Sequence, residues 1–316
     1  MNVEEIPGKL RDGYVALKKG ITDLYGQVNS KRLILDIHDE VLKGLVLDRD
    51  LPSLDIPLPT GACSQGLPTE VEAIGDLVGD LCLERGLIGA RVGACLPLAA
   101  SFWKVVRWPG GQVPDDGATE LRLMASEIDM PWSLPSVYLD VHPLTGSPGC
   151  SLVVASPRQF VDGWAEVFEL AGIQLQRLLP AQICEWQMLQ ESTGQKSRNP
   201  GEQWLLELGS LRSRLWVVED GVPLADWSLP GQRGAEGLDA ELRTRIDRCR
   251  RFWRQRRNSL KPQAWRVYGS DNSVDAVESD LRLLLGADSL ERWQPAAVGA
   301  NIDLRLAGLK VNMGWN

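Results

Sequence analysis

The sequence has 316 residues, of which 44% are hydrophobic and 24% charged, and its net charge at pH 7 is -8. This length exceeds what one hydrophobic core usually organises, so two domains are expected. The negative net charge argues against a nucleic-acid-binding protein whose whole surface attracts phosphate. The N-terminus lacks the pattern of a secretory signal, and no apolar run reaches the roughly 20 residues that span a bilayer. We therefore place the chain in the cytoplasm.

Six cysteines are scattered along the chain without a CxxC pair, and only two histidines accompany them. This pattern does not predict a zinc site or a Cys-His catalytic pair. Cys82 and Cys95 stand among apolar residues, as small core residues do in a reducing compartment. We expect no metal site.

Residues 1–30 carry apolar side chains at alternating spacings of four and three. These are Leu10, Tyr14, Leu17, Ile21, Leu24 and Val28. The spacing predicts an amphipathic N-terminal helix. Three glycines weaken it by about 1 kcal/mol each, so it needs a surface to pack on. The sequence leaves open whether that surface is the protein's own body, a partner or a membrane.

The first half alternates strands and helices. Residues 32–37 and 42–47 are apolar runs separated by polar residues, which predicts a hairpin of buried strands. Residues 51–68 are rich in proline and predict a loop. Apolar spacings of three and four predict a helix over 70–86. Further strands are predicted at 90–98, 101–109, 136–144 and 150–157, and further helices at 117–128 and 158–172.

The second half begins after the polar stretch 190–202, which lacks large apolar residues and marks a boundary. Three strands joined by tight turns are predicted at 203–209, 214–221 and 223–231, which makes an antiparallel meander. Next come a long helix at 238–258, a strand at 264–269, a helix at 274–285 and a helix or strand at 296–308. Because each half opens with a hairpin and continues into helices and strands, we predict two similar α/β halves facing a cleft.

A family resemblance follows from the order and spacing of these segments. From Arg32 to about Leu309 they resemble the PilM family of type IV pilus assembly proteins, which is related in fold to FtsA, actin, sugar kinases and the heat-shock ATPases. The segments that carry it are 35–47, 89–109, 120–144, 151–189, 204–231 and 264–286.

The resemblance implies an α/β fold of the actin-like ATPase type, with two lobes and an FtsA-like small subdomain inserted in the first. It implies a first actin-like domain at 31–182 with the insert at about 98–173, a second at 183–294, and a C-terminal segment, 295–316, that returns to the first domain.

Members of this family sit at the inner face of the cytoplasmic membrane. There they bind the short cytosolic N-terminal tail of a bitopic protein, PilN, in a groove between the first-domain core and the insert. The resemblance implies the same scaffold role here, with a PilN-like partner, pilus motor ATPases as further partners and peripheral membrane association through the partner. Trp103, Trp108 and Trp132 are the candidates for lining the groove, because large aromatic side chains dominate peptide recognition.

The resemblance also implies an ATP site, in which two hairpins present backbone amides and small hydroxyls to the phosphates. The first hairpin keeps Asp36 and Lys43, but His38, Asp39 and Glu40 replace its glycine and hydroxyls. Near a triphosphate, a like charge about 4 Å away costs roughly 4 kcal/mol at an effective dielectric near 20.

The second hairpin keeps Glu207, Gly209 and Ser210, and the adenosine loop keeps Gly269. We therefore expect a remnant of the ATP site that is degenerate, with no cofactor and no catalytic residue. Binding of Mg-ATP stays open. The rival hypothesis is an active actin-like ATPase or small-molecule kinase, which needs a general base in the cleft. The altered glycine loops argue against it.

Residues 243–261 concentrate eight arginines in an otherwise acidic chain. They predict either a solvated helix face paired with nearby acids or a surface for anionic headgroups or an acidic partner. Nucleic acid is not expected. A related secretion-system protein of the same architecture would be expected to continue into a transmembrane helix, whereas the sequence ends at Asn316 without one.

Overall fold

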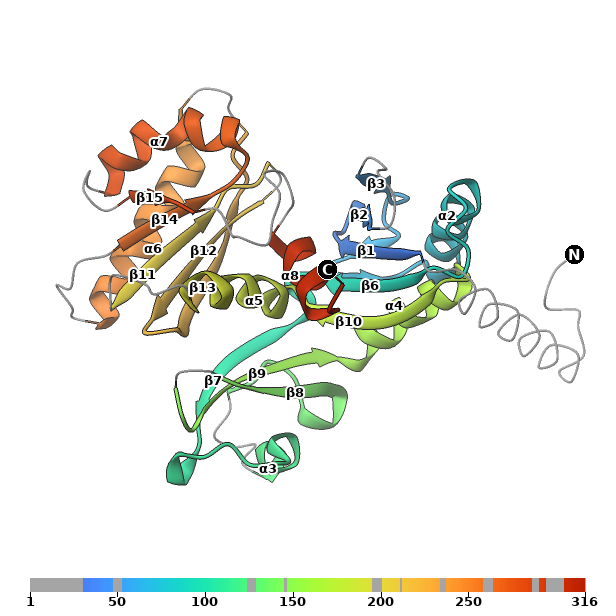
Figure 1. Cartoon of the computed structure of the whole chain (residues 1–316), viewed down its shortest axis with the longest axis horizontal. Helices are drawn as coiled ribbons and strands as arrows, with labels where there is room; N and C mark the ends of the chain where they lie inside the picture. The colour runs from blue at the N-terminus through green and yellow to red at the C-terminus, as the bar shows by residue number, and fades with distance from the viewer. Residues whose placement is uncertain are drawn as a thin grey trace, which may run out of the picture.

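The computed structural model describes residues 31–47, 53–123, 129–144, 147–194, 201–210, 212–233, 237–257, 264–285, 290–293 and 304–315. The predicted N-terminal helix lies outside these residues. Figure 1 shows two lobes, each built on a five-stranded sheet, and a smaller three-stranded sheet beneath their junction.

The first lobe is a sheet with strand order β10-β6-β1-β2-β3, covered by helices on both faces. Its strands are β1 (Arg32–Ile37), β2 (Val41–Val46), β3 (Leu54–Pro57), β6 (Arg91–Leu96) and β10 (Gln174–Pro180). Its helices are α2 (Val71–Glu84) and α4 (Arg158–Leu170) on one face, and α5 (Ala181–Gly194) and α8 (Leu304–Asn312) on the other. β1 pairs antiparallel with β2 and parallel with β6, which confirms the predicted hairpin.

Side chains of β1 alternate between the two faces of this sheet. Leu33, Leu35 and Ile37 join the core under α2 and α4, whereas Ile34 packs with α5 and α8. Because side chains along a strand alternate with period two, Asp36 lies on the same face as Ile34. The strand register therefore directs a carboxylate into the layer of α5 and α8.

The second lobe repeats this topology. Its strands are β11 (Glu202–Glu207), β12 (Arg212–Glu219), β13 (Val222–Pro230), β14 (Ala264–Tyr268) and β15 (Leu290–Arg292), in the order β13-β12-β11-β14-β15. As in the first lobe, an antiparallel meander of three strands continues into two parallel strands. Helices α6 (Ala240–Arg257) and α7 (Asp271–Leu285) share the lobe's core. The predicted similarity of the two halves is thus confirmed.

The three-stranded sheet has the order β7-β9-β8 and is antiparallel throughout. Its strands are β7 (Phe102–Arg107), β8 (Val137–Pro143) and β9 (Cys150–Pro157). We call this sheet, together with the helix α3 (Gly117–Leu123), the insert. The segment that enters it follows β6, and β9 runs directly into α4. α4 lies inside the bounds expected for the insert, 98–173, and packs on α2 of the first lobe.

Two parts of the first lobe differ from the sequence prediction. The predicted loop at 51–68 contains β3 and a small hairpin of β4 (Cys63–Ser64) and β5 (Leu67–Pro68). β10 and α5 were not predicted. β10 lies at the edge of its sheet and shows no alternation of burial, and α5 is buried on all sides from Ala181 to Trp186. A helix without a polar face has no amphipathic pattern to detect.

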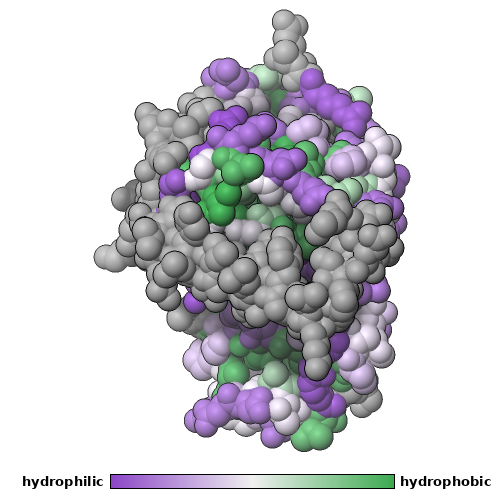
Figure 2. Space-filling view, turned by 90° about the vertical axis from the view of Figure 1, so that its right-hand side faces the viewer, coloured by the Kyte–Doolittle hydropathy of each residue, from purple (hydrophilic) through white to green (hydrophobic). Residues whose placement is uncertain are grey.

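The end of the first lobe formed by α2 and α4 exposes apolar side chains. Figure 2 faces this end and shows hydrophobic residues reaching the surface among hydrophilic ones. Leu83 of α2 is 63% exposed, and Ile88 and Leu170 are also exposed. Among the described helices, none combines the length and the apolar character needed to cross a membrane.

Candidate functional site

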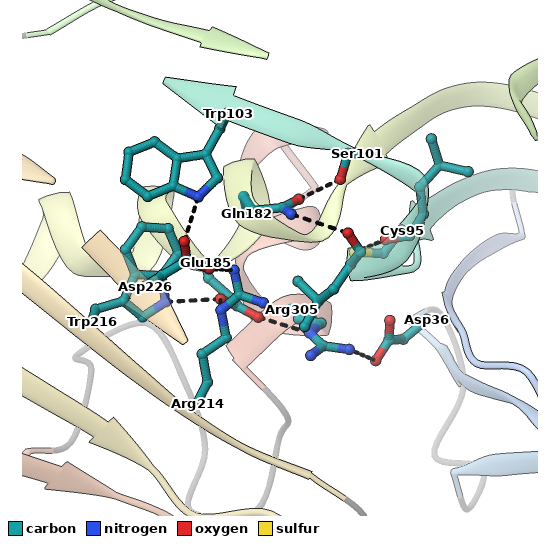
Figure 3. A network of polar contacts seen from close by, with 12 residues as sticks. Asp36, Cys95, Ser101, Trp103, Gln182, Glu185, Arg214, Trp216, Asp226 and Arg305 are labelled. Carbon is teal, nitrogen blue, oxygen red and sulfur yellow. Dashed lines mark hydrogen bonds and ion pairs between the residues drawn. The ribbon is translucent and has the colours of Figure 1, made fainter. Parts of the chain in front are cut away.

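A chain of polar side chains, all buried except the half-buried Asp226, runs through the junction of the two lobes and the insert. Figure 3 shows it passing from Asp36 through Arg305, Glu185 and Arg214 to Asp226. The charges alternate in sign along this chain. We call these five residues the junction network.

The first-lobe end of the junction network is the carboxylate of Asp36, which is fully buried at the end of β1. Arg305 Nη1 of α8 lies 3.4 Å from Asp36 Oδ2, and His38 Nε2 lies 2.8 Å from the same oxygen. Lys43 is the antiparallel neighbour of Asp36 on β2. Asp36 Oδ2 therefore has cationic or polar partners supplied by the protein, whereas the buried Asp36 Oδ1 accepts no hydrogen bond from the described residues.

Glu185 of α5 is the centre of the network and is 1% exposed. Its Oε1 accepts a hydrogen bond of 2.8 Å from Arg305 Nε. Its Oε2 lies 2.7 Å from Arg214 Nε and accepts a bond of 2.9 Å from Trp216 Nε1. A buried carboxylate needs such partners because desolvation penalises its charge.

The second-lobe end is formed by β12 and β13. Arg214 of β12 also pairs with Asp226 of β13, and Asp226 accepts a hydrogen bond of 2.7 Å from Trp103 Nε1 of the insert. Trp103 stacks on Trp216 with ring centroids 5.3 Å apart. The network therefore joins the first lobe, α5 and α8, the second lobe and the insert.

A glycine allows α8 to approach α5 closely enough to complete these contacts. A Cβ atom on Gly308 would lie 1.8 Å from the carbonyl oxygen of Cys184, so the two helices touch backbone to backbone. Glu185 follows Cys184 directly, and Arg305 precedes Gly308 by about one helical turn. The close helix contact therefore places the guanidinium of Arg305 beside Glu185.

Electrostatics in the network differ at its two ends. Burial by itself would raise the pKa of Asp36, but Arg305, His38 and Lys43 outweigh it and hold this pKa below its usual value. At the other end, burial raises the pKa of Asp226 although Arg214 opposes it, and the charge of Glu185 adds to the rise. The positively charged neighbours thus outweigh burial at Asp36 but not at Asp226.

A cavity of about 300 Å³ opens beside the network, between the lobes. It is lined by the β1–β2 turn, by the segment after β6, and by Arg212, Arg233 and Arg305. The turn residues are His38, Asp39 and Glu40, which were predicted to replace the phosphate-binding residues. Asp39 accepts a hydrogen bond of 2.6 Å from the backbone N of Gly66, so its carboxylate is held against the β4–β5 hairpin.

The remaining predicted nucleotide residues lie in the corresponding turns of the second lobe. Glu207 is the last residue of β11, much as Asp36 lies near the end of β1. Gly209 and Ser210 lie in the turn from β11 to β12. A Cβ on Gly209 would lie 2.3 Å from Arg212 O, and one on Gly269 would lie 3.1 Å from Leu208 O. Backbone packing in this lobe therefore requires a glycine at position 209 and favours one at position 269.

The three predicted groove tryptophans do not share one surface. Trp103 faces the second lobe, and Trp108 is 3% exposed in the insert's own core, where it donates to Ser151 Oγ at 2.7 Å. Trp132 is half-buried in the segment before β8. This segment is fastened to α4, because Arg158 Nε donates to Pro135 O at 3.2 Å. Pro135 therefore lies at the boundary between the insert and the first lobe, in the same segment as Trp132.

Sequence reasoning identified Asp36 but missed Glu185, Arg214 and Arg305. Glu185 and Arg305 are charged residues among mostly apolar neighbours, in the segments 181–188 and 304–309, whereas Arg214 follows Arg212 and Ser213 and shows no such pattern. A lone charge in an apolar segment could have indicated a buried ion pair, because a charge in a buried element needs a partner. The sequence does not identify that partner, since Asp36 and Arg305 are 269 positions apart.

Comparison with known proteins gives matches in structure. No family profile and no curated protein matches the sequence. The PilM-PilN type IV pilus biogenesis complex matches with a TM-score of 0.64 at 20% identity, over 89% of this chain and 98% of that chain. The chain has the actin-like ATPase fold. A second match is the cytoplasmic domain of EpsL, an inner membrane component of the type II secretion system of Vibrio cholerae, with a TM-score of 0.50 at 10% identity, over 91% of this chain and 96% of that chain.

The actin-like fold implies a magnesium nucleotide between the lobes, where the cavity lies. Asp36, which the resemblance keeps in the first hairpin of the ATP site, contacts Arg305. The β1–β2 turn presents His38, Asp39 and Glu40 to the cavity in place of glycine and hydroxyls. Within the described residues there is also no cluster of three or more His, Cys, Asp or Glu side chains that could hold a metal.

Proposed function

We propose that this protein is a cytoplasmic scaffold of type IV pilus assembly that binds the short cytosolic tail of a PilN-like membrane protein without a nucleotide. The observation that carries this proposal is the likeness to the PilM-PilN complex, which extends over 98% of the matched chain. The match covers 89% of this chain and has a TM-score of 0.64, against 0.50 for the type II secretion protein.

The tail would bind where the insert meets the first lobe, beside Trp132. Contacts already link these parts there: Tyr138 of β8 donates to Asp162 Oδ1 of α4 at 2.9 Å, and Arg158 of α4 lies 4.3 Å from the ring of Tyr138. A half-buried tryptophan beside a boundary that is held together by such contacts is typical of a binding hot spot. Trp103 and Trp108 then act indirectly, by holding the insert to the second lobe and by filling its core.

The degenerate nucleotide site is the second part of the proposal. Arg305 gives Asp36 a permanent cationic partner, so bringing Mg²⁺ there would require displacement of a buried guanidinium. Removing one partner of a buried ion pair costs about 3–5 kcal/mol. The junction network would connect the lobes in the role that a bound nucleotide has in an actin-like ATPase. An active ATPase or kinase is the less favoured function.

As such a scaffold, the protein would stand at the inner face of the cytoplasmic membrane, held there by its partner. It would pass force or signals between pilus motor ATPases and the proteins that span the envelope. Capture of a short peptide in a groove needs no catalysis, which agrees with the arrangement of the site.

Isothermal titration of the whole protein with a synthetic N-terminal peptide of the PilN-like protein tests this function. We expect saturable binding to the wild type, and at least about tenfold weaker binding to Trp132→Ala, as for a hot-spot residue. Phe252→Ser, on α6 of the second lobe, is the control and should bind like the wild type. No binding to the wild type would contradict the proposed function, and equal binding by Trp132→Ala would contradict the proposed location.

A further inference from the structure

The outer face of α6 combines basic and aromatic side chains in a way that the proposed scaffold function does not use. Seven arginines of this helix are exposed, namely Arg243, Arg245, Arg248, Arg251, Arg254, Arg256 and Arg257. Phe252, in their midst, is 49% exposed. An apolar ring left in water beside several cations marks a surface that gains from being covered.

The inner face of α6 fixes which residues point outward. Leu242, Ile246, Cys249 and Trp253 are buried in the second-lobe core. At about 100° per residue, Arg245, Arg248, Phe252 and Arg256 fall within about 80° of arc on one exposed flank of the helix, centred about 90° from the buried side. We call these four residues the basic face. From Arg245 to Arg256 it extends about 16 Å along the helix axis, at about 1.5 Å per residue.

The arginines of the basic face are not neutralised by neighbouring acids. Arg243 pairs with Asp280, Arg251 with Asp247 and Arg257 with Glu219. Among the described residues, in contrast, Arg245, Arg248 and Arg256 have no ion pair. The expectation that the arginine run is a solvated face paired with nearby acids therefore holds for one part of the helix and fails for the basic face.

We propose that the basic face of α6 binds anionic lipid headgroups, with Phe252 entering the interfacial region of the bilayer. Unpaired arginines match a negatively charged surface, each contributing attraction within a Debye length. A single ring placed among them supplies the shallow apolar anchor that interfacial helices use. Glu241 is exposed on the same side of the helix and opposes this attraction at its N-terminal end. The remainder of an acidic protein would be repelled, so this face would set its orientation.

A lipid surface is favoured over an acidic protein partner by the shape and chemistry of the basic face. The side chains project from a convex helix, and a flat sheet of headgroups can meet several of them at once. The exposed ring has no apolar neighbour on the basic face with which to form a pocket for a partner's side chain. Weak lipid attachment would add a second, separate contact to the membrane beside the peptide-bound partner, and stable anchoring commonly needs two signals.

Co-sedimentation of the purified whole chain with vesicles tests this proposal. The probes are vesicles of phosphatidylcholine alone and vesicles that also contain phosphatidylglycerol, each at low and physiological ionic strength. We expect binding to the anionic vesicles only, weakened by salt. Arg245→Gln with Arg248→Gln should lower the partition coefficient about thirtyfold, since each arginine near such a surface is worth about a factor of five. Phe252→Ser should lower it about tenfold.

The matched control is Arg85→Gln with Arg91→Gln, which makes the same change in net charge at exposed positions of the first lobe. It should bind vesicles like the wild type. If the control loses as much binding as the α6 variant, the basic face is not the site. If the wild type does not sediment with anionic vesicles, the proposal is overturned, and an acidic protein becomes the partner to seek. Neither outcome affects the peptide titration, which uses no lipid.

Discussion

Arg305 is the residue on which the junction depends most. It is 7% exposed and contacts both Asp36 and Glu185, so its loss leaves two buried carboxylates short of a cation. We expect Arg305→Met to lower the free energy of unfolding by about 3–5 kcal/mol, measured by urea denaturation. Arg251→Met removes an exposed pair and should cost no more than about 1 kcal/mol. Equal losses of unfolding free energy in the two variants would show that the buried ion pairs of Arg305 stabilise the protein no more than the exposed pair does.

The titration of Asp36 gives a second prediction at the residue scale. Despite its burial, Arg305, His38 and Lys43 hold its pKa below the usual value. Such a group contributes stability that is present above its unfolded-state pKa of about 3.9 and is lost as the pH falls through the folded-state pKa. Asp36→Asn should therefore be less stable than the wild type at neutral pH, and the gap should narrow below about pH 4. A difference in the free energy of unfolding between the two proteins that stays the same at every pH would contradict this prediction.

At the scale of elements, the contact of α5 with α8 depends on Gly308. A methyl group there would lie 1.8 Å from Cys184 O, so the helices would have to separate and draw Arg305 away from Glu185. We expect Gly308→Ala to destabilise the protein by about 1–3 kcal/mol or more. Gly79→Ala in α2 is the control: its Cβ would lie 3.4 Å from Ala171, and alanine favours a helix by up to about 1 kcal/mol. Similar melting behaviour of the two variants would refute the close-contact account.

The sequence predicted the elements that have a periodic face or form a short apolar run bounded by polar residues. α2, α4 and α6 each bury one side, and their bounds follow the apolar spacing closely. β1, β11 and β12 are short apolar runs that are buried on both faces. α5 and β10 escaped prediction because burial on all sides, or at an exposed sheet edge, removes that periodicity. The same limit applies to the candidate site. Glu185 lies on α5, which was not predicted, and its partners come from distant segments of the chain.

At the scale of the whole molecule, the sequence predicted two similar halves, and the structure gives them one topology. The cores explain how they are held together: Leu205, Trp216 and Val218 of the second lobe, Ile183 and Trp186 of α5, and Leu152 and Val154 of the insert share one apolar cluster. The junction network lies against this cluster, so apolar and polar side chains of the chain itself connect the three parts. Sequence patterns do not reveal such a junction, because its residues come from elements distant in the chain.

The central claim is that the scaffold captures its partner's tail without a nucleotide, and one measurement addresses it directly. The N-terminal peptide of the PilN-like protein is titrated calorimetrically into the wild-type protein, once in EDTA and once with saturating Mg-ATP. The account predicts the same Kd in both buffers, and no heat of binding when Mg-ATP is titrated alone. Binding of the peptide only in the presence of Mg-ATP would contradict it.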